Sequence, residues 1–192
     1  MEPCDLRGAD IPAWLKKVTA EAGPLSGIAH AAGIQTVRPL RMLDDAVMNE
    51  TMAINLNTAV GLTRGFRQKG VCEGGGSIVL FSSVMALAGQ PGQAAYSASK
   101  GALISMCRSL ALELARDKIR INCIAPGLVE TEMGGRLRDS LPPAQFEAVT
   151  AMHPLGLGCP ESIAAPVVFL LSAAAAWITG TTLVVDGGYT AH

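Results

Sequence analysis

Two kinds of segment follow one another along this chain. Short, continuous apolar runs typical of buried parallel strands lie at residues 25–30, 77–83, 119–127 and 181–188. Segments with the longer apolar patterns typical of helices occupy residues 10–20, 44–69, 94–115 and 159–175. This alternation predicts right-handed βαβ crossovers, and therefore an α/β fold in which a Rossmann-like parallel sheet carries helices on both faces.

No linker or shift in composition divides the chain, so we expect residues 1–192 to form one domain. Asp10 is placed to cap the first helix, with Pro12 in its first turn. Pro166 lies inside the last helical segment and is expected to kink that helix.

Composition narrows the possible partners. Hydrophobic residues make up 49% of the chain and aromatic residues only 4%, so an aliphatic, alanine-rich core is expected. The net charge of −1 gives no electrostatic footprint for nucleic acid or an anionic membrane, and neither is expected as a partner. The longest apolar run, residues 164–178, is interrupted by Pro166 and Ser172 and is too short to span a bilayer.

The cysteines are odd in number and far apart: Cys4, Cys72, Cys107, Cys123 and Cys159. They form no CxxC pair and no cluster with histidine, so we expect no metal site and favour reduced core thiols. The first ten residues are acidic and polar, without the basic and apolar regions of a signal peptide. A reducing, cytoplasmic location is the expectation that follows.

Tyr96 and Lys100 are the first candidates for chemistry. They stand four residues apart in a helical segment, so their side chains share one face. An ammonium beside the phenol favours the phenolate, which predicts a lowered pKa for Tyr96 and a role in proton transfer to or from a substrate oxygen. Taken alone, this spacing also occurs by chance on helix surfaces.

The serines at the end of the 77–83 run change that balance. Ser83 lies at the carboxyl end of a buried strand, where open α/β sheets bind their ligands. It precedes Tyr96 by a loop long enough to bring the two together, so its hydroxyl is placed to hydrogen-bond a substrate oxygen. A turn or helix-capping serine is the alternative.

Three stretches then point to one family. SIVLFSSVMALAGQPGQAAYSASKGAL, RINCIAPGLVETEM and ITGTTLVVDGG occur in this order, and the chain from Asp5 to Tyr189 resembles the short-chain dehydrogenase/reductase family. It is most similar to the 3-oxoacyl-[acyl-carrier-protein] reductases. The resemblance implies hydride transfer between NAD or NADP and a ketone or secondary alcohol, with a 3-oxoacyl thioester as one possible substrate.

The resemblance also implies roles for individual residues. Tyr96 would be the general acid/base, Lys100 would lower its pKa and bind the nicotinamide ribose, and Ser83 would orient the carbonyl. Asn55 matches the helix asparagine that holds a water in the proton relay. Read without the family, Asn55 is a polar residue that bends a helix by competing for backbone hydrogen bonds.

Further positions match the part of the family that binds cofactor. Those that would line the nicotinamide are Pro126, Gly127, Val129 and Thr131. Tyr96 is expected to contact the cofactor together with Lys100. Asp5 resembles the acidic residue that meets the adenine, although a surface aspartate explains it nearly as well. The family's Asn-Asn-Ala-Gly appears as His30 to Gly33: Ala31 lacks the side-chain hydrogen bonds of the usual asparagine, and Gly33 still permits close backbone approach. His30 itself is interpreted as a packed or capped histidine.

One family feature is missing. Before Asp5 we find no strand, glycine-rich turn and helix of the kind that holds the pyrophosphate, and Gly74 to Gly76 precede a strand instead of opening a helix. We therefore expect an absent first βαβ unit, impaired cofactor binding, an unreadable choice between NAD and NADP, and an apolar edge at residues 25–30. A catalytically silent fragment that acts as a packing or interaction protein is the competing hypothesis.

Two expectations concern partners. A short apolar lid over residues 132–154 suits a modest apolar substrate, although lids vary and fold does not fix substrate. The resemblance also implies a homo-dimer or homo-tetramer, formed through the helices at residues 44–69 and 94–115.

Overall fold

The computed structural model describes residues 4–72 and 74–191, so Glu73, the first residue of the EGGG turn, lies outside the described part. Its sheet consists of β1 (Gly27–His30), β2 (Gly76–Phe81), β3 (Ile119–Pro126) and β4 (Thr182–Val185). All neighbouring strands pair in parallel, in the order β1-β2-β3-β4. The predicted α/β, Rossmann-like fold is confirmed, and β1 is an edge of the described sheet, as the sequence indicates.

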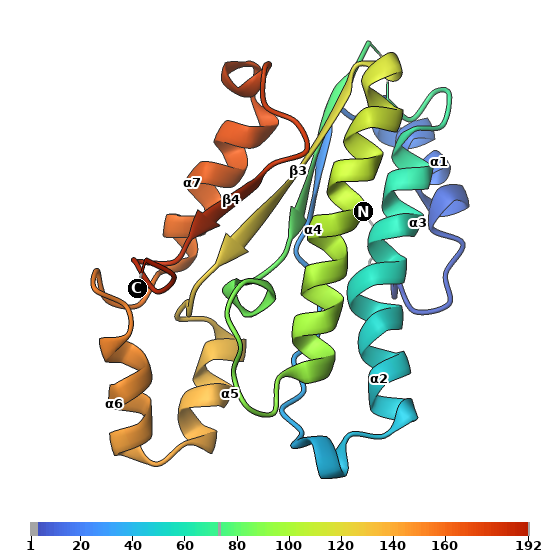
Figure 1. Cartoon of the computed structure of the whole chain (residues 1–192). Helices are drawn as coiled ribbons and strands as arrows, with labels where there is room; N and C mark the ends of the chain where they lie inside the picture. The colour runs from blue at the N-terminus through green and yellow to red at the C-terminus, as the bar shows by residue number, and fades with distance from the viewer. Residues whose placement is uncertain (1–3, 73, 192) are drawn as a thin grey trace.

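Helices cover both faces of this sheet (Figure 1). The elements on one face are α1 (Ile11–Ala22), α2 (Asp45–Met52), α3 (Thr58–Phe66) and α4 (Ala94–Leu114), and α7 (Pro160–Leu171) lies on the other. The α1 helix begins where predicted, because the Asp10 carboxylate accepts a hydrogen bond of 3.1 Å from the Ala13 amide. The α7 helix contains Pro166 and ends at Leu171, because the Ser172 hydroxyl caps the separate turn Ala173–Ala175.

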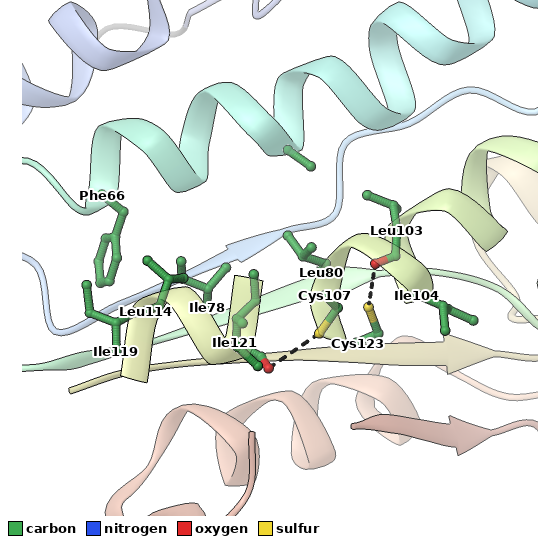
Figure 2. Close-up of a cluster of buried hydrophobic side chains, with 12 residues drawn as sticks. Phe66, Ile78, Leu80, Leu103, Ile104, Cys107, Leu114, Ile119, Ile121 and Cys123 are labelled. Atoms are coloured by element: carbon green, nitrogen blue, oxygen red, sulfur yellow. Dashed lines mark hydrogen bonds between the residues drawn. The ribbon is translucent and has the colours of Figure 1, made fainter. Parts of the chain in front are cut away.

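The pleat of β2 divides the core between the two faces. Ile78 and Leu80 pack toward α3 and α4, whereas Val79, between them in sequence, packs against α7. Figure 2 shows the larger cluster, in which the Cys107 thiol donates to the Ile121 carbonyl and the Cys123 thiol to the Leu103 carbonyl. All of the cysteines are free, and these two are buried core thiols as predicted. The prediction was wrong for Cys159, which is exposed at the start of α7, and Cys4 and Cys72 are only partly buried.

The segment predicted as one long helix over residues 44–69 is interrupted. Asp44 caps α2, but a π-helical turn, Ala53–Asn57, separates α2 from α3. A π turn changes the direction in which side chains leave the helix and is common at functional sites. Asn55 lies inside this turn and is completely buried.

Two short helices complete the structure at the carboxyl edge of the sheet. They are α5 (Glu132–Ser140) and α6 (Pro143–Ala151), and they correspond to the predicted lid (Figure 1). Within the described residues, no helix combines the length and apolar character needed to cross a membrane.

Candidate active site

The carboxyl ends of β2 and β3, the start of α4 and the two lid helices enclose a cavity of about 420 Å³. The predicted residues that line it are Ala31, Gly33, Ser83, Tyr96, Lys100, Pro126, Gly127, Val129 and Thr131. Asn55 and Asp5 do not line it. Predicted residues from four separate parts of the sequence therefore meet at the edge of the sheet where open α/β folds bind ligands.

Ser83 and Tyr96 both line the wall of this cavity, and both residues are 8% exposed. Burial raises the pKa of the phenol, and Ser83 acts on it closely enough to lower that pKa in part. The Ser83 oxygen also accepts a bond of 3.2 Å from the Met85 amide, which orients the hydroxyl at the end of β2. Two hydroxyl groups are thus fixed side by side where a substrate oxygen could contact both.

The pKa of Tyr96 is raised, and the prediction of a lowered value was wrong for this structure. Burial of the phenol raises its pKa, and the hydrogen bond from Ser83 opposes this effect only in part. The Lys100 nitrogen lies 5.7 Å from the centre of the Tyr96 ring and is not among the groups that lower the pKa. Desolvation therefore outweighs the nearby cation.

Lys100 is directed into the protein, not toward solvent. Its Nζ atom donates a 2.7 Å hydrogen bond to the Phe81 carbonyl at the end of β2, and the residue is 5% exposed. Burial lowers the pKa of Lys100 to about 8. The Ser82 hydroxyl donates to the Lys100 carbonyl at 2.9 Å, so Ser82 holds α4 against the end of β2.

Asn55 lies behind the cavity and forms hydrogen bonds with two of the segments around it. Its side-chain oxygen accepts from the Ile34 amide at 2.8 Å, and its side-chain nitrogen donates to the Ile34 carbonyl and the Ser99 hydroxyl, both at 2.9 Å. The Ser99 hydroxyl in turn donates to the Tyr96 carbonyl at 2.7 Å. The π turn thus connects the loop after β1 to the helix that carries Tyr96. The bent-helix interpretation does not describe this side chain, because its partners lie outside its own helix.

Gly33 lies close to two of the candidate site residues. A Cβ atom at Gly33 would lie 3.1 Å from the Asn55 side-chain oxygen and 3.3 Å from the Lys100 nitrogen. Both distances are tighter than ordinary contact, so a methyl group would displace one of the two. The close approach that the sequence indicated is present, and Ala31 on the same loop contributes an exposed, apolar edge.

The segment after β3 forms the facing wall. A Cβ atom at Gly127 would lie 2.9 Å from the Asp186 Cα, so this glycine permits the close approach of the turn after β4. The Asp186 carboxylate accepts from the amides of Gly188 and Thr190 at 2.9 and 2.8 Å, which agrees with a structural role. Thr131 caps α5, accepting from the Gly134 amide at 3.2 Å.

Two acidic or basic candidates stand apart from the cavity. Asp5 is exposed and forms an ion pair of 2.8 Å with Arg7, whose hydrogen bonds lower the pKa of Asp5 to about 2. His30 is buried against Thr58, with 2.9 Å between Nε2 and the threonine hydroxyl. Burial and then the charge of Lys100 lower the pKa of His30 to about 4. The interpretation of His30 as a packed histidine is confirmed.

Sequence reasoning missed His153, which lines the cavity from the end of the lid. Its Nε2 atom accepts from the Leu128 amide at 3.1 Å, and its Nδ1 atom lies 2.9 Å from the Val149 carbonyl. The ring lies against that of Tyr189, with 4.9 Å between centroids. No short motif marks this histidine, because its partners come from three separate segments.

The cavity fits the nicotinamide half of a dinucleotide. A buried ammonium, a glycine without room for a methyl group and the small residues after β3 surround one side of it. Within the described residues, Gly74 and Gly75 have φ values of +73° and +100° in the turn before β2, so they do not open a helix. Nor do the described residues include a group of three or more His, Cys, Asp or Glu side chains suited to a metal ion.

Comparison with known proteins agrees with this site. The family model described as enoyl-(acyl carrier protein) reductase matches residues 2–190. The chain therefore belongs to the short-chain dehydrogenase/reductase family, a family of oxidoreductase enzymes.

Three relatives illustrate the similarity of this chain to known members of the family. Galactitol 2-dehydrogenase (L-tagatose-forming) from Cereibacter sphaeroides is 40% identical over 175 residues, covering 89% of this chain and 68% of the relative. The 3-oxoacyl-[acyl-carrier-protein] reductase FabG of Escherichia coli K12 is 36% identical over 181 residues, covering 94% of this chain and 72% of the relative. A 4-hydroxyisoleucine dehydrogenase solved with NADH and succinate has a TM-score of 0.86 at 31% identity, covering 98% of this chain and 78% of that one.

Proposed function

We propose that this chain catalyses hydride exchange between a nicotinamide cofactor and a ketone or secondary alcohol, with Tyr96 transferring the proton. The observation that carries the proposal is the presence of Ser83, Tyr96 and the buried Lys100 in the wall of one cavity. Together these residues provide a proton donor, a second hydroxyl for the same oxygen and a nearby positive charge.

The raised pKa of Tyr96 keeps the phenol protonated near neutral pH, which is the form needed to reduce a ketone. Ser83 would donate a hydrogen bond to the same carbonyl oxygen and hold it against the phenol. As Tyr96 gives up its proton, the ammonium of Lys100 would stabilise the developing phenolate, because an opposite charge favours the charged form. The nicotinamide, when bound, supplies or accepts the hydride.

The cofactor is NAD or NADP in this proposal. Lys100 would bind the nicotinamide ribose, and Ala31, Gly33, Pro126 and Gly127 would line the cofactor. Val129 and Thr131 would do so from the segment that leads into α5. Support comes from their position around one cavity and from the NADH in the structurally similar 4-hydroxyisoleucine dehydrogenase. Asp5 would meet the adenine from outside this cavity.

A 3-oxoacyl thioester is the substrate that we propose, supported by the Escherichia coli reductase, which is 36% identical over 94% of this chain. We further propose a homo-dimer or homo-tetramer assembled through α2, α3 and α4, on which Leu112 is 83% exposed. The free cysteines favour a reducing, cytoplasmic compartment for the activity. The alternative of a catalytically silent fragment is not favoured. It gives no role to Ser83, Tyr96 and Lys100, which line one cavity.

The direct experiment titrates the purified 192-residue chain with NADH and with NADPH, and then follows cofactor oxidation as a panel of ketones is added. The proposal expects saturable binding of at least one cofactor and ketone-dependent oxidation. Absence of both at millimolar cofactor would contradict it. Light scattering on the same sample tests the proposed assembly, for which a monomer would be the contrary result.

A further inference from the structure

We propose that the cavity selects neutral ketones and secondary alcohols that carry an aliphatic arm, and that Met133 and Leu137 exclude substrates with an anionic arm. The inference rests on the proposed function for the reacting group. It concerns the opposite end of the substrate, which that proposal leaves undefined.

The polar and apolar parts of the cavity are separate. Ser83, Tyr96 and Lys100 lie together at the start of α4. Aliphatic and thioether side chains from the lid and the elements around it line much of the rest of the cavity: Met85, Met133, Leu137, Val149, Met152 and Ile163. The uncharged polar side chains of Gln35, Gln90 and Thr131 also line it. A substrate whose oxygen contacts Ser83 and Tyr96 would therefore extend its arm along apolar side chains.

Charge is nearly absent from this wall. Among the described residues that line the cavity, Lys100 is the one lysine or arginine, and its ammonium is held at the Phe81 carbonyl beside the reacting end. The remaining ring nitrogens belong to His153, and both lie within hydrogen-bond distance of backbone groups of Leu128 and Val149. An anionic arm along the apolar side chains would lose its hydration here without meeting a cation, which is unfavourable.

Arg136 lines a neighbouring depression of about 290 Å³ instead of the cavity, and lies 3.5 Å from the Glu132 carboxylate. Met133 and Leu137 are one helical turn apart in α5, and they line both the depression and the cavity, as do Gly33 and Gln35. Met133 and Leu137 would therefore present apolar surface to the substrate arm, while Arg136 offers it no cation in the cavity wall.

Binding without cofactor tests this inference separately from catalysis. Two ligands of equal length, 2-octanone and 7-oxooctanoate, share the methyl ketone and differ only in a terminal methyl or carboxylate. Ligand-observed saturation-transfer NMR on the full chain would give the affinity of each. We expect the keto acid to bind at least about tenfold more weakly, because its carboxylate must be desolvated. The polyhydroxylated ketone fructose is expected to bind as weakly as the keto acid.

Two leucine variants make the test specific. Leu137→Arg places a cation in the cavity wall and is expected to bring the two affinities within about twofold of each other, by pairing with the carboxylate. Leu155→Arg adds the same charge beside the lid at a residue that is 87% exposed and does not line the cavity, so the preference should persist.

Equal binding of both ligands by the unmodified chain would overturn the inference, as would binding of neither. Loss of the preference in both variants would show that general surface charge, and not the cavity wall, sets it. A chain that prefers 2-octanone but reduces no ketone would contradict the proposed function and leave the selectivity intact. Reduction of ketones without this preference would do the reverse.

Discussion

Ser83, which follows the end of β2, lines the same cavity as Tyr96 in the first turn of α4, thirteen positions later in the sequence. Burial raises the pKa of the Tyr96 phenol, and Ser83 acts to lower it. This arrangement places two hydroxyl groups in the cavity wall together with Lys100. It depends on the packing of α4 against the sheet and on the hydrogen bonds of Asn55 behind the cavity.

Gly33 tests the close packing beside Lys100. Gly33→Ala should lower ketone reduction by at least about tenfold, because its methyl group would displace Lys100 or Asn55 from the geometry that the reaction needs. Steady-state rates and circular dichroism of the variant would separate lost activity from lost folding.

Gly101→Ala is the matched control, since a Cβ atom at Gly101 meets nothing within 4 Å. Gly101 lies inside α4, so alanine there should raise the free energy of unfolding by about 0.5–1 kcal/mol. Activity close to that of the unmodified chain is expected for this variant. Equal activities of the two variants would contradict the importance of the packing at Gly33.

Substitution of Asn55 tests the hydrogen bonds behind the cavity. Asn55→Ala leaves the Ile34 amide and carbonyl without their buried partner, so the free energy of unfolding should fall by about 1–3 kcal/mol. Urea unfolding would measure the loss. Asn49→Ala, at an exposed position of α2, should change stability by less than about 0.5 kcal/mol. A similar loss in both variants would show that helix propensity, not the bonds to Ile34, is responsible.

His30 predicts how stability depends on pH. Its pKa is about 4 in the folded chain and 6.5 in its ordinary state, so the unfolded chain binds more protons between these values. Stability therefore rises with pH across that window and falls on acidification through it. The full loss is about 3 kcal/mol, because each tenfold change in proton affinity corresponds to about 1.4 kcal/mol.

The measurement is urea unfolding at several pH values for the unmodified chain and for His30→Gln, which cannot be protonated. The difference between the two curves removes the contribution of carboxylates that titrate in the same range. We expect the variant to lose less stability on acidification. Parallel curves would contradict the assignment of the buried, neutral state to His30.

The reacting residues could be predicted from sequence because each is set by local structure. Tyr96 and Lys100 share a helix face by their spacing, and Ser83 follows a strand whose continuous apolar run marks it as buried. The sheet and its helices followed from the same apolar runs. Gly33 was found through the family pattern, and the structure adds the physical reason for it.

Features that depend on distant partners could not be predicted. The π turn at Asn55 is fixed by Ile34, 21 positions away, and by Ser99, 44 positions away, so the local pattern indicated one continuous helix. The pKa of Tyr96 depends on how deeply the phenol is buried, which spacing along a helix does not reveal. His153 escaped notice for the same reason, since its contacts join the lid to the segment after β3.

The rate of ketone reduction by Tyr96→Phe under saturating NADH or NADPH tests proton transfer by Tyr96 most directly. Removing the phenol oxygen should lower the rate by about 10²–10⁴-fold, the usual contribution of a general acid, while cofactor affinity stays within about twofold. Tyr189→Phe, which removes the other tyrosine hydroxyl of the cavity wall, should reduce the rate far less. A Tyr96→Phe variant that reduces ketones as fast as the unmodified chain would contradict proton transfer by Tyr96.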